Sequence, residues 1–301
     1  MTMPSEPART VFFLSDFGTQ DEFAGVVHAV ITRRAPATTI IDLTHNVPPF
    51  DVRAGSHTLV RAVPHLGPGV VLGVVDPGVG TDRRGICIEV PLAAGGTLYF
   101  VGPDNGLLVA AAEAAGEAPI ARVVELRREE PPPAPVQGAT FDGRDLFAPA
   151  AAALCAGTAP GELGETVEPA SLVRLAGGVV EQGRLHDGRT CLRAEVTWVD
   201  HFGNLQLAAT MADARVAGIP LVGSIELAAR IESGNEYLHG LPHSLVPDGV
   251  ALRCVDAFGD LKPGEFGLLV DANGHLAVVA GEASAASWLN VTAGELLILA
   301  W

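Results

Sequence analysis

The chain has 301 residues, of which 48% are hydrophobic and 18% charged, so most of it is expected to fold around a sizeable core rather than stay disordered. Its 19 Lys and Arg against 35 Asp and Glu give a formal net charge of -16, which argues against nucleic acid or an anionic membrane as a partner. The apolar runs are too short for a membrane span, and the first of them, at 11–14, is too short for a secretory signal.

Segments typical of strands and of helices alternate through about the first 150 residues. The run at 70–75 is continuously apolar and β-branched, as in a strand buried on both faces. This alternation predicts an α/β domain with a largely parallel sheet in three layers. The expected strands are 11–14, 39–43, 70–75, 86–90 and 98–101, and the expected helices are 21–34, 52–63, 107–115 and 148–156.

The composition changes twice further along the chain. Residues 127–135 are rich in Pro and Glu and are expected to form a stiff exposed loop, and 177–189 are rich in Gly and polar residues. Short strand signals follow, which predicts a smaller all-β, barrel-like domain. The boundary is placed near residue 185, give or take ten, giving domains 1–185 and 186–301. The expected strands of the second domain are 193–199, 224–228, 250–255, 266–270, 275–279 and 295–299.

The four cysteines form no CxxC pair, which is against a zinc knuckle or a redox dithiol. Buried, reduced thiols are the expected state, and they suit a cytoplasmic protein. The histidines do not form a ligand set with carboxylates, so no metal is predicted; those considered were His28, His45, His57, His65 and His201.

Polar clusters follow several of the expected strands, at 15–21, 42–51, 76–83 and 140–145. In open α/β sheets, ligands bind beyond the carboxyl ends of the strands, so these clusters are candidate site segments. Each has a plainer interpretation: Asp16 and Asp51 could cap helices, and Gly78 and Gly80 could serve turns. The absence of GxGxxG, GxxxxGK[ST] and GxSxG disfavours a standard dinucleotide site, a P-loop and an α/β-hydrolase.

Six segments in order resemble a known family: VFFLSDFGTQDEFAG, DLTHNVPPFDVRAG, VVDPGVGTDRRG, FVGPDNGLL, TFDGRDLFAPAAA and VDHFGNLQ. They are similar to the S-adenosyl-L-methionine hydrolases that use hydroxide as nucleophile, the hydroxide adenosyltransferases, in the superfamily of the fluorinases and chlorinases. The resemblance implies hydrolysis of S-adenosyl-L-methionine to adenosine and L-methionine, with no metal or separate cofactor. It also implies a homotrimer in which the β-barrel-like domain completes the neighbouring subunit's site.

The resemblance also implies roles for residues that hold the substrate. Asp16 would accept from the ribose hydroxyls, and Phe50 would pack against the sugar. Asp21 and Asp200 match positions at the methionine end, where a carboxylate can pair with the α-ammonium.

Two further residues match positions near the adenine. Asn204 would form hydrogen bonds with the base and Phe258 would stack on it. For Asn204 the alternative is a role in the Phe-Gly-Asn turn.

The reacting group is implied to be Asp76, Arg83 and a distant third residue. The family has His in that third place, whereas this chain has Asp142 in TFDGRD. Asp76 and Asp142 are interpreted as sharing the activation of water beside Arg83. The alternative is that Asp142 only ties down Arg83 and leaves Asp76 as the base.

Two other functions stay open. A halide-dependent 5′-halogenase is disfavoured because acidic side chains at positions 76 and 142 repel a halide ion. A non-catalytic S-adenosyl-L-methionine or adenosine binder is the second alternative. Residues 271–276 depart from the family pattern near the methionine carboxylate and could instead be a hairpin with an Asn-Gly type I′ turn.

Overall fold

The computed structural model describes residues 10–117, 120–128, 138, 140–231 and 244–301, with the side chains of 229–231 and 244–248 left aside. The chain divides into two compact units, Met1–Leu175 and Ala176–Trp301. The expected boundary at 185 lies ten residues beyond this division. The second unit begins earlier because β8 (Val180–Arg184) pairs with β9 (Thr190–Val199) of the same unit.

The first unit contains one seven-stranded sheet, with the order β2-β1-β3-β5-β4-β6-β7. Neighbours from β2 to β5 pair in parallel, and β4, β6 and β7 continue the sheet with antiparallel pairs. The predicted α/β domain with a largely parallel sheet is thus confirmed. The strands are β1 (Thr10–Ser15), β2 (Thr39–Thr44), β3 (Gly69–Val74), β4 (Gly85–Pro91), β5 (Thr97–Pro103), β6 (Arg122–Leu126) and β7 (Gly164–Val167).

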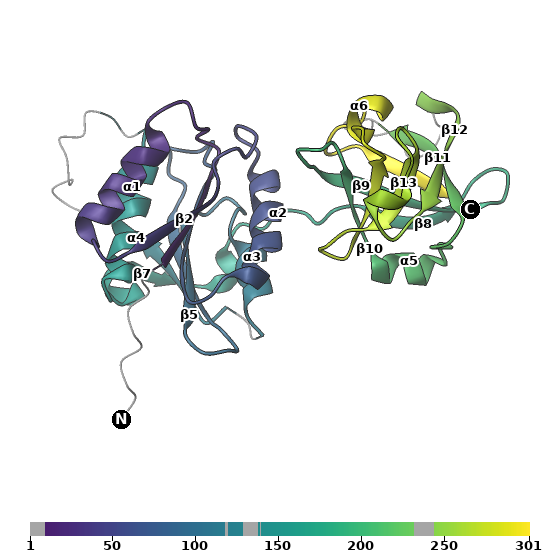
Figure 1. Ribbon diagram of the computed structural model, residues 1–301. Coiled ribbons are helices and arrows are strands. Elements are labelled where there is room, and N and C mark those ends of the chain that lie inside the picture. Colours follow the sequence, from purple (N-terminus) through teal and green to yellow (C-terminus); the bar gives the residue numbers. More distant parts are fainter. Residues whose placement is uncertain (1–9, 118–119, 129–137, 139, 232–243) are drawn as a thin grey trace. The chain divides into compact units, whose positions relative to one another are not determined.

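Helices cover both faces of this sheet (Figure 1). On one face α1 (Phe23–Arg34) packs with α4 (Ala148–Cys155), and on the other α2 (Val52–Ala62) packs with α3 (Val109–Ala115). Every residue of β3 is buried, as its continuous apolar sequence predicts for a strand between two helical layers. The three expected layers are therefore present, and the polar loops after β1, β2 and β3 emerge at one edge of the sheet.

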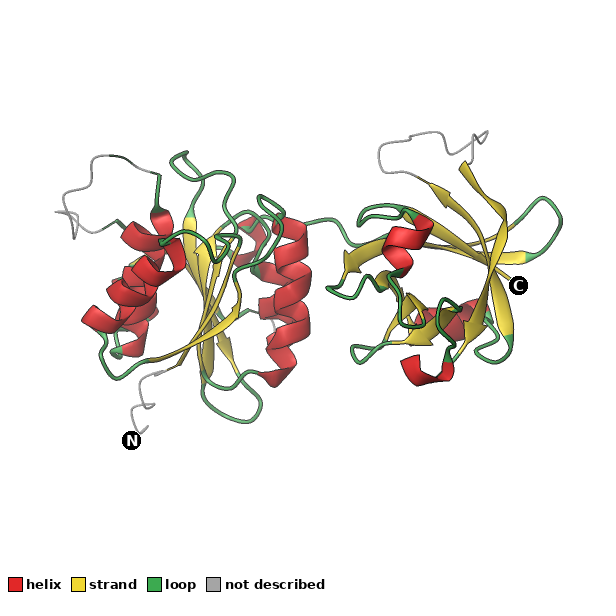
Figure 2. Cartoon of the chain, turned by 45° about the horizontal axis from the view of Figure 1, so that its top comes forward, coloured by secondary structure: helices red, strands yellow, loops and turns green. Residues whose placement is uncertain are grey.

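The second unit is a closed barrel, which confirms the predicted barrel-like domain (Figure 2). Its strands follow the order β10-β14-β13-β12-β11-β15-β9, and a further β10–β9 pairing closes the ring. Alternate residues of these strands fill the interior, among them Val196, Leu227 and Val278. The remaining elements are β10 (Leu205–Thr210), α5 (Met211–Ala217), β11 (Ser224–Ile231), β12 (Ser244–Cys254), β13 (Phe266–Val270), β14 (His275–Ala280), α6 (Ala285–Leu289) and β15 (Leu296–Ala300).

The hairpin expected at 271–276 joins β13 to β14, but its turn is not type I′. A type I′ turn needs a positive φ at both central residues, and Asn273 does not have one, whereas Gly274 has φ 80°. Asp271 accepts from the backbone N–H groups of Asn273 and His275 at 2.8 and 3.0 Å. The side chain of Asp271 thus favours a longer turn that ends in a left-handed glycine.

Within the described residues, none of the helices combines the length and the apolar character needed to cross a bilayer.

Candidate functional site

Asp76, Arg83 and Asp142 lie together, although 59 positions separate the last two in the chain. Arg83 Nε donates to Asp76 Oδ1 and Oδ2 at 2.9 and 3.0 Å, and its Nη2 also reaches Asp76 Oδ2. The same Nη2 donates to Asp142 Oδ2 at 2.5 Å. One guanidinium therefore bridges two carboxylates, both of which are almost completely buried.

The loop that follows β3 presents Asp76 and Arg83 on one side. Val79 N–H donates to the Asp76 carbonyl at 3.2 Å, and Thr81 Oγ1 donates to the Gly78 carbonyl at 2.7 Å. These turns fold the loop back, so that the Arg83 side chain returns to Asp76. The sequence pattern of Asp, Pro and Gly after a strand is typical of such a loop.

A single turn of π-helix, Gly143–Phe147, follows Asp142 and leads directly into α4. A Cβ atom at Gly143 would lie 3.1 Å from the rings of both Phe141 and Phe17, so glycine lets this turn pack closely on the aromatic side chains. The Phe147 ring lies 5.1 Å from Arg83 Cζ and covers one side of the guanidinium. π-turns within helices are common at functional sites, which is consistent with a functional role for this segment.

The electrostatics of the cluster depend on a fourth side chain, Arg128. Its Nη2 lies 2.7 Å from Oδ1 and 2.8 Å from Oδ2 of Asp142. Two guanidinium groups thus balance the formal charges of Asp76 and Asp142. Burial by itself lowers the pKa of Arg83, but its hydrogen bonds and charge interactions with the two carboxylates outweigh this effect and raise the pKa above its usual value.

Sequence reasoning did not find Arg128. The residue falls in the stretch 127–135, whose composition predicts an exposed loop, and 129–137 lie outside the described residues. The missed signal was β6, a short strand that ends two residues before Arg128. Three of the other polar clusters follow β1, β2 and β3, so the same rule applied to β6 would have identified Arg128 as a candidate.

Asp16 and Phe50 form a second part of the candidate site. Phe50 N–H donates to Asp16 Oδ2 at 2.9 Å. Phe50 has φ 68°, an unfavourable conformation for a bulky residue, and its side chain is 72% exposed. The Asp16 contact stabilises this conformation, which leaves the Phe50 ring at the surface.

The two helix-cap interpretations have different outcomes. Asp51 is the N-cap of α2, since its carboxylate accepts from Ala54 N–H at 2.9 Å. The N-cap of α1 is Glu22, so Asp16 does not cap that helix. Asp21 lies exposed in the segment just before α1.

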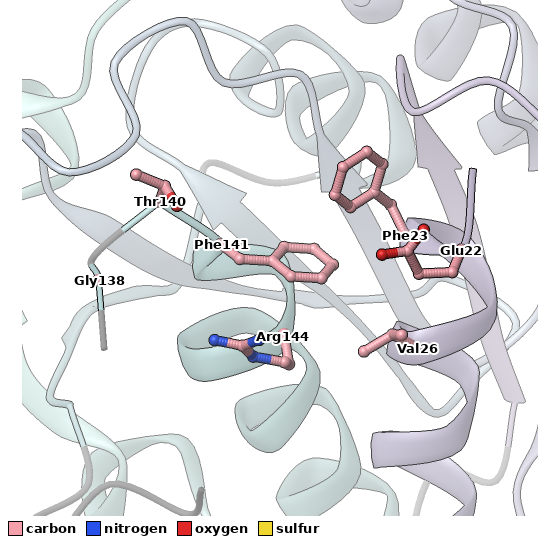
Figure 3. Close-up of a pocket in the computed structure, with 7 residues that line it drawn as sticks. All are labelled: Glu22, Phe23, Val26, Gly138, Thr140, Phe141 and Arg144. Atoms are coloured by element: carbon pink, nitrogen blue, oxygen red, sulfur yellow. The ribbon is translucent and has the colours of Figure 1, made fainter. Parts of the chain in front are cut away.

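A pocket of about 600 Å³ lies between the start of α1 and the segment before the π-turn. Figure 3 shows the Phe141 ring extending toward Phe23 and Val26, with Arg144 beside it. The centroids of Phe23 and Phe141 are 5.3 Å apart, in an edge-on arrangement. The lining contains none of the sequence-predicted site residues, although Phe141 directly precedes Asp142.

The predicted residues of the second unit lie on exposed or partly exposed loops. Asp200 Oδ1 accepts from Phe202 and Asn204 N–H, each at 2.9 Å, and Asn204 Nδ2 donates to Asp200 Oδ2 at 2.8 Å. Asn204 therefore has the turn contact that was considered as its alternative, and Asp200 organises the same turn. Phe258 is 54% exposed at the start of a short 3-10 turn.

Three side chains lie close together, although the sequence predicts that the histidines form no ligand set with a carboxylate. His28, Asp42 and His45 place their ligand-type atoms within 4.8 Å of one another. The residues come from α1, the carboxyl end of β2 and the loop after it. Their spacing of 14 and 3 positions matches no local motif, so only the packing of α1 beside β2 brings them together.

Comparisons with known proteins agree with the motifs. Residues 11–164 match the family profile described as the SAM hydroxide adenosyltransferase N-terminal domain, and residues 194–298 match its C-terminal domain. The chain is 44% identical over 291 residues to the "(R)-S-adenosyl-L-methionine hydrolase" of Salinispora tropica, covering 97% of each chain. It is 41% identical over 261 residues to the protein of the same name from Thermus thermophilus, covering 84% of this chain and 91% of the relative.

More distant relatives and solved structures extend the comparison. The chain is 26% identical over 324 residues to a fluorinase from Actinoplanes, and the alignment covers 97% of each chain. A crystal structure of an uncharacterised conserved protein from Thermotoga maritima superposes with a TM-score of 0.77 at 30% identity, covering 96% of this chain and 99% of that one.

Proposed function

Because the chain belongs to the S-adenosyl-L-methionine hydroxide adenosyltransferase family, we propose that the cluster of Asp76, Arg83 and Asp142 activates water to hydrolyse S-adenosyl-L-methionine. Water forms a bond to the ribose C5′ on the face opposite the sulfur. The C5′–S bond breaks, and its electron pair leaves with the sulfur of L-methionine. The water proton passes to a carboxylate, and the products are adenosine and L-methionine. The protein is an enzyme of the hydrolase type.

The observation that carries the proposal is the guanidinium of Arg83 held between two buried carboxylates. A sulfonium is a good leaving group, so the displacement needs little acid catalysis. The enzyme has to position the water in line and to stabilise the charge that develops on it. Arg83 supplies a fixed positive charge for a developing hydroxide, and an adjacent carboxylate accepts the proton. No metal or separate cofactor takes part in this step.

The geometry favours Asp76 as the proton acceptor. Asp142 Oδ2 accepts from both Arg83 and Arg128, and Asp142 Oδ1 lies 2.7 Å from Arg128 Nη2 outside hydrogen-bonding geometry. Among the described residues, the Asp76 carboxylate is paired only with Arg83. A carboxylate between two guanidinium groups is better suited to hold Arg83 in place than to accept a proton. This assignment corresponds to the alternative in which Asp142 fixes Arg83.

The substrate is held by residues of both units. Asp16 accepts from Phe50 N–H through one oxygen, and its second oxygen, which has no partner among the described residues, would accept from a ribose hydroxyl. The exposed Phe50 ring packs on the sugar, and Asp21 with Asp200 meets the methionine ammonium. Asn204 and Phe258 contact the adenine. The relatives from Salinispora tropica and Thermus thermophilus are named for the (R)-sulfonium epimer, so the (R) epimer is the expected substrate.

The active assembly is a homotrimer located in the cytoplasm. The second unit of one subunit completes the site of its neighbour, as the family resemblance implies. The cytoplasmic location is supported by four cysteines that are all unpaired. Burial raises the pKa of the Cys155 thiol to about 11, which keeps it protonated and unreactive at neutral pH.

The decisive experiment is turnover of each sulfonium epimer in ¹⁸O-labelled water, with and without chloride or fluoride. We expect the label in the 5′-OH of adenosine, preferential consumption of the (R) epimer and no effect of halide. A 5′-halo-adenosine as the main product would identify a halogenase instead. Tight binding of the substrate without any product would identify a non-catalytic binder.

A further inference from the structure

We propose that His28, Asp42 and His45 form a binding site for one divalent transition-metal ion of the zinc class. Asp42 Oδ1 lies 2.8 Å from His28 Nε2 and 3.1 Å from His45 Nε2. Two imidazoles and a carboxylate are a ligand set that suits zinc and related ions, with a fourth position left for water. Binding replaces the contacts of Asp42 with the two rings by bonds of about 2.0 to 2.2 Å from each group to the ion.

The orientation of His45 is the observation that points to a ligand. Its Nε2 is buried and has no partner in hydrogen-bonding geometry among the described residues, although it faces Asp42. The residue is 8% exposed, and its ring packs edge-on against Phe13 with the centroids 4.6 Å apart. A buried polar atom without a partner costs free energy, and coordination of an ion by its lone pair would remove that cost.

The other nitrogen of His45 is already fixed. Its Nδ1 lies 2.7 Å from Oγ of Ser15, which is completely buried at the end of β1. When Nδ1 carries the proton and donates it to Ser15, the lone pair of Nε2 points to Asp42 and His28. Histidines that bind metals are commonly oriented by such a bond from the second ring nitrogen.

Access and position also fit an ion. The His28 and Asp42 side chains are 34% and 42% exposed, so an ion can enter from solvent and retain a water ligand. The three ligands belong to α1, β2 and the following loop, which makes the expected role structural: the ion fastens α1 to the edge of the sheet. None of the three residues belongs to the machinery proposed for hydrolysis.

The test is calorimetric titration of the full chain with ZnCl₂ after removal of metals with a chelator. We expect one ion per chain for the unmodified protein. We also expect at least about tenfold weaker binding in His28→Ala and in Asp42→Asn, because each loses a ligand. The control is His65→Ala, which removes an exposed histidine outside the cluster and should bind as the unmodified protein does.

Two further measurements keep the result interpretable. Circular dichroism establishes that each variant is folded. If His28→Ala does not fold, Asp42→Asn remains as the test variant, because it is a nearly isosteric change at a partly exposed site. Zn²⁺ should raise the Tm of the unmodified protein and of Asp76→Asn, but not that of Asp42→Asn. Absence of a stoichiometric ion, or equal binding by all variants, would overturn the proposal and leave the hydrolase assignment unaffected.

Discussion

Arg83 is the side chain around which the cluster of Asp76 and Asp142, proposed to activate water, is arranged. Its guanidinium contacts both carboxylates and rests against Phe147, and it therefore links Asp76 to Asp142. Asp142 places a second negative charge beside Arg83, and Arg128 compensates for it. The two acidic residues therefore have different surroundings, and substitutions should separate their roles.

Asp76→Asn should lower kcat by about 10² to 10⁴, the usual contribution of a general base. Asp142→Asn should lower kcat by more than roughly tenfold while KM changes little, because it loosens Arg83 without touching the substrate. Steady-state kinetics over a range of pH distinguishes the role of Asp76 from that of Asp142. If Asp142 only positions Arg83, the pH dependence of Asp142→Asn keeps its shape, and an unchanged kcat would remove Asp142 from the mechanism.

Arg128→Gln should reduce kcat by only about twofold to fivefold, because the side chain is half-exposed and its ion pair is partly screened by solvent. The loss should grow as the salt concentration falls, since screening is then weaker. The matched control is Arg127→Gln, which changes the exposed neighbour. Equal losses in both variants would show that Arg128 has no specific role.

At the scale of elements, α2 connects stability to the candidate site. The helix begins at Asp51, and the residue before this cap is Phe50, whose backbone is held by Asp16. The carboxylate of Asp51 satisfies an N–H group that the first turn of the helix leaves without a partner. A change at the cap should therefore affect both the helix and the presentation of the Phe50 ring.

Asp51→Ala should lower the free energy of unfolding by about 0.5 to 2 kcal/mol and raise KM, whereas Asp51→Asn should preserve both, since Asn is an equivalent cap. Urea denaturation and substrate kinetics on the three proteins provide the measurements. A stable Asp51→Ala variant with an unchanged KM would contradict the coupling between the cap and Phe50.

At the scale of the whole molecule, the proposed substrate contacts are divided between the two compact units. Asp16, Asp21, Phe50 and the reacting cluster belong to the first, and Asp200, Asn204 and Phe258 belong to the second. The proposal that a trimer shares its sites between subunits can therefore be tested by combining a chain substituted in the first unit with a chain substituted in the second.

Co-expression of Asp76→Asn with Phe258→Ala should restore activity that neither chain has alone at limiting substrate. Random assembly gives intact pairs at about a quarter of the shared sites. Light scattering on the same samples should report a trimer. No recovery in a mixed trimer would indicate that each site is completed within one chain.

The sequence predicted the local elements well where a single segment carries the signal. The buried strand β3 and the helices α1 and α2 follow from apolar spacing, and the ordered motifs led to the family. The strands β6, β7, β8 and β10 were not predicted, and each is held in place by backbone pairing with neighbouring strands. The turn before His275 was misassigned because Asp271 adds side-chain contacts that the Asn-Gly signal does not include.

By itself, the sequence determined the α/β and barrel architecture, the family and the candidate residues Asp76, Arg83 and Asp142, since these depend on periodicity and on motifs read along the chain. Only the tertiary structure decided that Arg128 shares Asp142, and that His28 and His45 converge on Asp42. The physical reason is that charge balance and ligand geometry are set by distances in space. Those distances arise when β6 joins the sheet and α1 packs beside β2, and no spacing along the chain encodes them.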